Sequence, residues 1–546
     1  MATDIKRATP NPWLVLGLIC LPVFIGSLDL TIVSAFLPDI VVKLGLPVQT
    51  ALDDATWVIS GYLLAYAISM TFMGRISDMI GRRKVYIACL IVFIIGSIMV
   101  ATAHQWPTDI LNTIARRLGQ RPEREVVTLV AIVIGRVVQA LGAGALVPVS
   151  LALVGDIFPP QRRAQPLGII GAVDTLGWVL GHLYGGILVQ FLPWQDLFWI
   201  NVPVTLVALA LTVYALRNVQ EKRAGGRFDI LGTLLISAAL IALIVGLGGN
   251  TEVSTSAGSF SDVTGLPPYA LPAILISAAC LIGFVFVESR VKDPLIDLGM
   301  FRVRAVSAGS LVNLLVGFCL MIGLVSVPIL VNIRSSAAPA PAPVVAAADT
   351  PAVPETPAQS GDEILTHAAL TVGLLLSALT VPMALAAVPG GWLSDRIGYR
   401  RTTVIGLSLA LVGFLLIWLT WTLTLSDAVI ALEMAMVGVG LGLTFSPVSA
   451  AVINSASEDR RGVASALVII LRLIGMTVAI SSLTTIALQR VNLLATAELA
   501  QQTADATQAL NVYARITVQV LAEVGLVGAV MCVLALIPAA LGLRKP

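Results

Sequence analysis

Four ionisable side chains lie far inside long apolar stretches of the sequence: Asp29, Arg136, Asp174 and Arg472. An ionised group is costly among the apolar residues of a membrane helix, so it is functional by default and is normally paired. At about 1.5 Å rise per residue, Asp29 and Arg136 lie roughly 12 and 13 Å below the outer membrane surface. Asp174 and Arg472 both lie roughly 22 to 24 Å below that surface. The spacing predicts two buried charge pairs, and in the first of them Asp29 can exchange a proton for a cationic partner.

Covalent catalysis has no matching residue pattern. The three histidines, His104, His182 and His367, fall in separate segments and form neither a nucleophile–base pair nor a metal set. The five cysteines are dispersed through apolar runs, where we expect them to act as small core residues. We therefore expect a protein that is not an enzyme and that holds no metal or cofactor. Its cytoplasmic loops are also too short for the folded output domain of a receptor.

The composition describes a membrane protein. Of 546 residues, 57% are hydrophobic and 12% are charged, and the mean hydropathy is +0.94, which excludes a chain with a water-facing surface. The net charge is only +2, so a nucleic acid is not an expected partner.

The elements that must position the charges are membrane-spanning helices. A span needs about 20 apolar residues, and this rule predicts an all-α polytopic protein of fourteen helices. Their predicted limits are 13–37, 54–74, 84–104, 127–155, 165–190, 198–217, 228–249, 270–288, 305–333, 366–389, 402–421, 428–453, 462–487 and 517–543.

The distribution of Lys and Arg predicts the orientation. Most of the 33 basic residues fall on the side that contains both chain ends, for example in the segments 82–84, 222–227 and 400–401. Because cytoplasmic loops carry the excess of Lys and Arg, we expect both termini in the cytoplasm and the chain in the cell membrane.

Three segments on the outer side depart from the simple pattern. Residues 105–125 carry basic and apolar residues in helical spacing, which predicts an amphipathic helix on the outer leaflet or, alternatively, a solvated loop with a short helix. Residues 335–362 are rich in Pro and Ala and are expected to be a disordered external loop. Residues 490–515 are expected to form a helical extension outside the membrane.

One loop sequence occurs twice. The segment Gly74–Lys84 (GRISDMIGRRK) returns, 317 residues later, as Gly391–Arg401 (GWLSDRIGYRR), with the glycines, the Ser-Asp pair and the final pair of basic residues in register. Two halves built from one plan are the natural explanation, and many secondary transporters have such repeats.

These features resemble the major facilitator superfamily, and specifically its fourteen-helix drug:proton antiporter branch. The loop Gly74–Lys84 is similar to the G-x-L-a-D-r-x-G-r-r motif of that superfamily. The resemblance implies two six-helix bundles, residues 1–217 and 305–546, joined by two extra transmembrane helices within residues 218–304. It also implies a cytoplasmic latch that closes in one state and opens in the other. The alternative is a loop that only sets topology through its positive charge.

The chemistry of the latch residues indicates which contacts each of them can make. Glycines permit a tight turn between close helices, Asp78 can meet a helix N-terminus, and Arg82 or Arg83 can meet an acid such as Asp156. The full set of predicted gate residues is Gly74, Asp78, Gly81, Arg82, Arg83, Asp156, Asp395 and Arg396.

Two further segments carry the resemblance. Leu28–Val33 (LDLTIV) is similar to the L-D-x-T-I-V motif of the antiporter branch, and Gly135–Gly144 is similar to its R-x-x-Q-G-x-G-a segment, with Ala140 in place of a glycine. We expect Asp29 to accept the coupled proton and Arg136 to be its partner. A permanent structural ion pair is the alternative.

The fifth predicted helix is rich in glycine. Gly177, Gly181, Gly185 and Gly186 predict very close helix packing, and His182 stands where antiporters of this superfamily usually have a proline. His182 is either a packing residue or a titratable group near the path.

Asp174 and Arg472 come from different halves, so their pairing would tie the halves together. Their positions, with Gly181-x-Leu183-Tyr184-Gly185, also resemble mycobacterial triacylglyceride exporters of this superfamily.

Glu433 and Glu523 lie within about two turns of outer helix ends and are interpreted as snorkelling to the interface.

The sequence predicts a proton-coupled exporter of lipophilic or amphipathic compounds that works by alternating access as a monomer. Its expected partners are protons, the lipid bilayer and a lipophilic small molecule or lipid. The alternative is an exporter of membrane lipids such as triacylglycerides.

Overall fold

The computed structural model describes residues 11–33, 36–45, 55–189, 191–219, 225, 227–247, 269–337, 361–499 and 506–543. The side chains of a few helical residues within these ranges, His182 and His367 among them, are outside the description. The predicted disordered loop 335–362 lies almost entirely outside the described residues. Every regular element in the described ranges is a helix.

All fourteen predicted helices are present. Twelve described segments are long and apolar enough to cross a membrane. Of the other two helices, α9 has 25 residues and α11 has 17. The long helices are α1 (Pro12–Ile32), α4 (Trp57–Ile80), α5 (Arg82–Ala101), α7 (Arg124–Ala143) with its continuation α8 (Leu146–Ile157), α9 (Ala164–Leu188), α10 (Trp194–Leu216), α11 (Ile230–Gly246), α13 (Ala270–Glu288), α14 (Arg304–Ala337), α15 (Gly361–Ile397), α16 (Tyr399–Thr420), α17 (Asp427–Ser455), α18 (Arg461–Leu499) and α19 (Ala506–Gly542).

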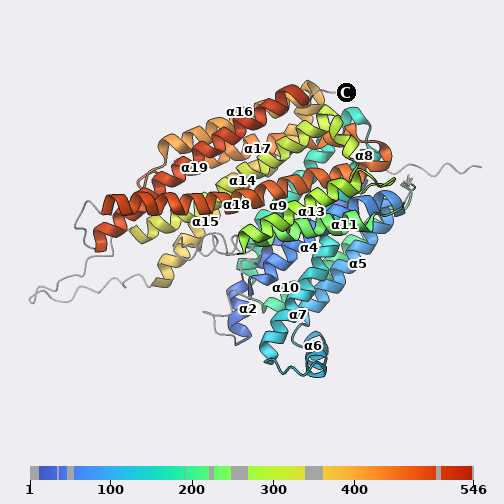
Figure 1. Ribbon diagram of the computed structural model, residues 1–546, viewed down its shortest axis with the longest axis horizontal. Helices are drawn as coiled ribbons and strands as arrows, with labels where there is room; N and C mark the ends of the chain where they lie inside the picture. The colour runs from blue at the N-terminus through green and yellow to red at the C-terminus, as the bar shows by residue number, and fades with distance from the viewer. Residues whose placement is uncertain are drawn as a thin grey trace, which may run out of the picture.

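The helices form two groups. Helices α1, α4, α5 and α7–α10 pack with one another, and α14–α19 pack with one another. The groups meet where α9 packs on α15 and where α18 packs on α4 and α8. Figure 1 shows the two groups close together near α8 and the end of α19, whereas α6 lies far from the end of α18 and the start of α19. We call the joined end, where the two repeated loops lie, the motif end.

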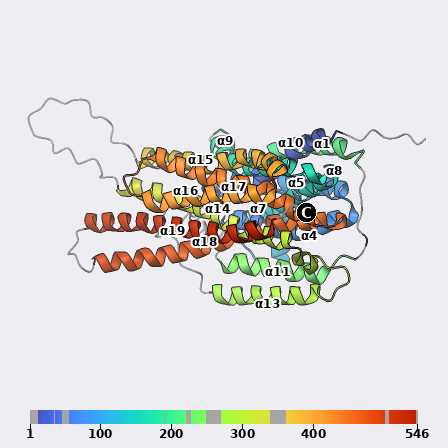
Figure 2. The same ribbon diagram turned by 90° about the horizontal axis from the view of Figure 1, so that it is seen from above.

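Helices α11 and α13 form a separate layer. They pack on each other, and α11 also packs on α4. In the view from above, α13 is outermost and α11 lies between it and the rest of the molecule (Figure 2).

The described parts of the segments predicted on the outer side are helical. Residues 105–125 contain α6 (Trp106–Arg117), which packs on α7 and leaves Ile110, Ile114 and Leu118 exposed. An Asp109–Arg124 salt bridge of 3.0 Å fastens it. The predicted extension 490–515 is present in its described residues, where α18 reaches Leu499 and α19 starts at Ala506.

The snorkelling interpretation is wrong for Glu433. Its side chain is 3% exposed, and it accepts hydrogen bonds from Thr420 Oγ1 at 2.7 Å and Trp421 Nε1 at 2.9 Å. These donors sit where α16 ends, so the carboxylate is satisfied inside the protein and has no need to reach the interface. Glu523 is partly exposed and pairs with Arg490 at 3.1 Å.

Candidate functional site

Asp29 lies in a closed polar cluster within the first group of helices. Both Asp29 and Arg136 are 0% exposed, and Arg136 Nη1 donates to Asp29 Oδ2 at 2.6 Å. Arg136 Nη2 also donates to the Asp29 carbonyl oxygen at 3.1 Å. The guanidinium lies 3.8 Å from the centre of the Tyr62 ring, a distance at which cation–π attraction is strong. The charge pair therefore has partners on several sides.

Two amides complete this cluster. Gln139 Nε2 donates to Asp29 Oδ1 at 3.1 Å, and Asn201 Nδ2 donates to the same oxygen at 2.8 Å. Gln139 lies one helical turn after Arg136 on α7, whereas Asn201 comes from α10. Sequence reasoning gave neither amide a role, although each is a polar residue in an apolar run, the same signal that singled out Asp29. Together they make a site shaped for an ionised carboxylate.

The second charge pair joins the two groups of helices. Arg472 Nη2 of α18 lies 3.4 Å from Asp174 Oδ2 of α9. Ser27 Oγ of α1 donates to Asp174 Oδ1 at 2.6 Å, and the Arg472 guanidinium lies 4.6 Å from the Phe445 ring centre. The ionic contact is longer than that of Arg136 with Asp29, and Asp174 has fewer donors.

The glycines of α9 bring that helix against α1. A Cβ on Gly177 would lie 2.9 Å from the Phe24 carbonyl oxygen, and one on Gly181 would lie 2.4 Å from the Leu28 carbonyl oxygen. Only glycine permits so close a crossing. Gly185 is buried on the same helix, and the side chain of His182 and residue Gly186 are outside the described surroundings.

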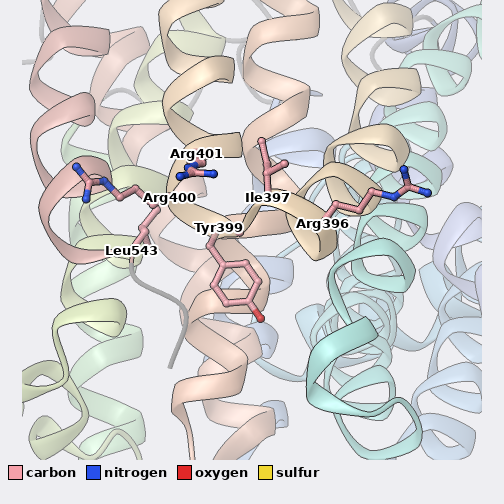
Figure 3. A pocket seen from close by; sticks show the side chains of 7 residues that line it. Arg396, Ile397, Tyr399, Arg400, Arg401 and Leu543 are labelled. Carbon is pink, nitrogen blue, oxygen red and sulfur yellow. The ribbon is translucent and has the colours of Figure 1, made fainter.

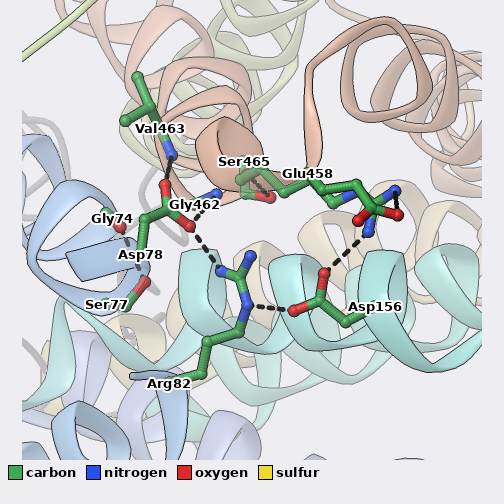
Figure 4. A network of polar contacts seen from close by, with 10 residues as sticks. Gly74, Ser77, Asp78, Arg82, Asp156, Glu458, Gly462, Val463 and Ser465 are labelled. Atoms are coloured by element: carbon green, nitrogen blue, oxygen red, sulfur yellow. Dashed lines mark hydrogen bonds and ion pairs between the residues drawn. The ribbon is translucent and has the colours of Figure 1, made fainter. Parts of the chain in front are cut away.

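At the motif end, the first repeated loop binds the N-terminus of α18. Asp78 Oδ1 accepts from the Gly462 amide at 3.0 Å and Asp78 Oδ2 accepts from the Val463 amide at 3.3 Å, which places the carboxylate on the N-terminus of α18 (Figure 4). Arg82 pairs with Asp78 at 3.0 Å and also with Asp156. A Cβ on Gly74 would lie 2.5 Å from the Gly462 carbonyl oxygen, so α4 and α18 cross backbone to backbone.

Asp156 extends this contact across the molecule. Arg461 Nη1 of α18 pairs with Asp156 Oδ1 of α8 at 2.9 Å. Gly81, with φ of +111°, adopts a backbone conformation that favours glycine and turns the chain from α4 into α5. Arg83, on the first turn of α5, is partly buried and makes an interaction of its own.

The second repeated loop makes the mirrored contact with α9. The Gln165 amide, at the start of α9, donates to Asp395 Oδ2 at 3.3 Å. A Cβ on Gly391 would lie 2.5 Å from the Ala164 carbonyl oxygen. Arg163 Nη1 donates to Asn454 Oδ1 at 2.6 Å, and Asn454 in turn donates to the Tyr399 hydroxyl at 2.7 Å. Burial, with the nearby charge of Arg461, lowers the pKa of Arg163 to about 10, so it stays a cation at neutral pH.

The two sides of the motif end therefore repeat one geometry with one difference. Arg461 follows Asn454 by seven residues, as Arg163 follows Asp156 by seven, and each arginine reaches the other half's partner. Asp156 carries a charge at the position where Asn454 is neutral. Beside the first loop, Arg461 therefore forms an ion pair with Asp156, whereas beside the second loop Arg163 donates to the neutral side chain of Asn454.

A basic pocket adjoins the second loop. A cavity of about 350 Å³ is lined by Arg396, Ile397, Gly398, Tyr399, Arg400, Arg401 and Leu543 (Figure 3). Arg396 stacks on the Trp392 ring with 3.9 Å between the guanidinium and the ring centre. Within the described residues, His, Cys, Asp and Glu form no group of three or more that could hold a metal ion.

The fold and the repeated loops define a polytopic helical transporter whose two halves meet at one end. The chain belongs to the Major Facilitator Superfamily, whose family model matches residues 19–361 and 350–539. Membership of this family makes the chain a membrane transporter and not an enzyme, as the sequence predicted.

The chain is similar to curated mycobacterial transporters. It is 31% identical over 474 residues to the triacylglyceride transporter of Mycobacteroides abscessus, covering 85% of this chain and 80% of that one. It is 30% identical over 484 residues to the triacylglyceride transporter of Mycobacterium tuberculosis, covering 86% and 82%.

Solved structures show the same fold. The human organic anion transporter MFSD10 gives a TM-score of 0.56 at 16% identity, covering 96% of this chain and 100% of that one. The proton:xylose symporter XylE, solved with 6-bromo-6-deoxy-D-glucose, gives 0.53 at 14% identity, covering 95% and 94%.

Proposed function

We propose that the protein exports a neutral lipid of the triacylglyceride class. The observation that carries this proposal is the 30–31% identity to triacylglyceride transporters over 85–86% of the chain. Of the two functions expected from the sequence, these relatives favour the alternative, lipid export, over export of amphipathic drugs. Mutual pairing of Asp29 with Arg136 and of Asp174 with Arg472 also favours an uncharged cargo, because neither pair offers a free charge to an ionic substrate.

We further propose that export works by alternating access between the halves 1–217 and 305–546, with residues 218–304 as linker. In the state described above, the motif end is closed by Asp78, Asp156 and Asp395. If this end faces the cytoplasm of a cell-membrane protein, as the distribution of Lys and Arg favours, the state is outward-facing. Opening the motif end requires these contacts, and the Asp174–Arg472 contact, to break.

Asp29 is our proposed proton acceptor. Protonation would remove its charge and release Arg136 from a 2.6 Å contact, so the two protonation states of the cluster differ in structure. A permanent ion pair would instead keep the same partners throughout the cycle.

Lipid transfer in proteoliposomes tests the proposed function. The purified chain, as a monomer, is reconstituted with a fluorescent triacylglyceride, and delivery of the lipid to acceptor vesicles is followed. Lipid delivery without extrusion of a cationic dye is the expected result. Dye extrusion coupled to proton movement, with no lipid delivery, would contradict lipid export.

The second candidate function is proton-coupled export of amphipathic compounds, and the Asp29 cluster is the observation that favours it. Asp29→Asn separates coupling from cargo: we expect transport by this variant to lose its dependence on pH. Asp39→Asn is the matched control, because Asp39 is a partly exposed carboxylate whose partner is Lys43, at 2.8 Å. A pH dependence unchanged in Asp29→Asn would remove Asp29 from the coupling mechanism.

A further inference from the structure

The linker helices are anchored at the line where the two halves meet. Ser277 Oγ of α13 donates to the Ala239 carbonyl oxygen of α11 at 2.8 Å, and α11 packs on α4. At the other end of α11, Ser481 Oγ of α18 donates to the Leu247 carbonyl oxygen. At the motif end, an apolar cluster combines residues of α11, α13, the following segment and α18: Ile236, Phe284, Leu295, Ile296 and Val463. The linker layer therefore contacts both halves.

Two carboxyl groups are buried at the motif end of this layer. Asp229 precedes α11, and its Oδ1 accepts from the Gly232 amide at 2.9 Å. Glu288 ends α13, and its Oε2 accepts from the Ile296 amide at 3.4 Å. Their side chains are 8% and 4% exposed. Asp229 Oδ2 and Glu288 Oε1 have no hydrogen-bond partner.

These two unpartnered oxygens converge on one point. A Cβ placed on Gly232 would lie 2.5 Å from Asp229 Oδ2 and 2.5 Å from Glu288 Oε1, so both oxygens lie beside this glycine, close to the same point. Two ionised carboxylates in one buried site repel each other, and each unpartnered oxygen adds a cost of desolvation. A carboxyl that keeps its proton is a donor, and its neighbour is then the acceptor.

We propose that Asp229 and Glu288 form a proton-binding site, in which one proton is held between Asp229 Oδ2 and Glu288 Oε1. That proton gives both oxygens a partner and removes one of two like charges. The site lies outside both helix groups and involves neither Asp29 nor Asp174. It does not depend on the cargo.

The surrounding charged groups have little effect on Asp229 and Glu288. Arg460 of η4 (Glu458–Arg460) favours the charged form of Glu288 but is already paired with Asp297 at 3.2 Å. The Arg227 amide is bound by Asp293. Charged groups on the elements packed around the site are Arg75 and Asp78 of α4, Arg227 before α11, Arg290, Lys292, Asp293 and Asp297 after α13, Glu458, Asp459 and Arg460 of η4, and Arg461 of α18.

Occupancy of the site is coupled to the motif end. Ile296, whose amide binds Glu288, packs in one cluster with Val463, whose amide binds Asp78. Loss of the proton places two like charges between α11 and α13 and pushes these helices apart. A rise in pH at the motif end therefore weakens the packing of the linker helices against the N-terminus of α18.

Infrared spectroscopy of the purified full-length chain in ester-free detergent at neutral pH tests the proposal. A protonated carboxyl has a carbonyl band that shifts when water is replaced by D₂O. We expect this band to be weaker by one carboxyl group in both Glu288→Gln and Asp229→Asn than in the unaltered chain. The two variants remove different carboxyl groups but should lose the same band. In each variant the remaining carboxylate accepts a hydrogen bond from the new amide and therefore no longer holds a proton.

Asp293→Asn is the matched control and should retain the full band, because Asp293 binds only the Arg227 amide in the same region. A full band in either Glu288→Gln or Asp229→Asn would overturn the proposal. Since the two variants alter different helices, a folding defect in one leaves the other as an independent test.

Discussion

The two buried charge pairs differ in how they are held. Asp29 and Arg136 belong to one group of helices, are fully buried, and gain further partners in Gln139, Asn201 and Tyr62. Asp174 and Arg472 belong to different groups and meet through a single contact of 3.4 Å. The first pair is built into one rigid body, whereas the second lies across the line along which two bodies separate.

This difference indicates what each pair can do. A pair saturated with partners changes only when its charge changes, so protonation is the event to which Asp29 can respond. A pair with one long contact is lost when the helices move. The Asp174–Arg472 contact therefore exists in only one relative position of the halves and stabilises that position.

The largest effect is expected from Arg136→Gln. Removing the cation leaves a buried carboxylate with amide donors only, which costs about 3–5 kcal/mol of the free energy of unfolding. Thermal unfolding in detergent measures this loss, and a protonated Asp29 in the variant would reduce it at low pH. A melting temperature equal to that of the unaltered chain would contradict the proposed rigidity of the cluster.

Gly462→Ala should have an intermediate effect on the closed state. The new Cβ would lie 2.3 Å from the Gly74 carbonyl oxygen, and such overpacking costs about 1–3 kcal/mol. We expect the motif end to open, as measured by faster labelling of a cysteine introduced at Ser77. Gly17→Ala is the matched control, because a Cβ there meets nothing within 4 Å. Equal labelling rates in the two variants would show that this crossing does not hold the end closed.

Arg472→Gln should have the smallest effect on stability and a large effect on transport. The 3.4 Å contact is lost but Ser27 still donates to Asp174, so we expect a loss of about 1–2 kcal/mol in unfolding and little lipid delivery. Arg490→Gln, which removes an exposed partner of Glu523, is the matched control. Lipid delivery by Arg472→Gln at the rate of this control would contradict a role for the contact.

The sequence predicted the helices and the charged residues well because both depend on local pattern. Hydropathy alone located all fourteen helices, and rise counting put Asp29 and Arg136 at one depth. Partners from distant helices were not predictable in this way: Asn201 reaches Asp29 from α10, and the binding of Asp78 to the α18 N-terminus depends on how the halves dock.

The errors and omissions have the same origin. Glu433 lies near a helix end in sequence, but Thr420 and Trp421, at the end of α16, supply its donors. Asp229 and Glu288 stand at the ends of two helices, where single charges are ordinary, and only the packing of α11 on α13 brings them together across Gly232.

A distance measurement across the motif end tests the alternating-access account most directly. Nitroxide labels on the exposed residues Ile80 and Arg400, one on each half, report the separation of the halves by pulsed electron paramagnetic resonance. In the unaltered chain we expect mostly the short distance of the closed state, and in Asp174→Asn a shift towards a longer one. An identical distance distribution in both proteins would contradict the claim that the Asp174–Arg472 contact helps to hold the halves together.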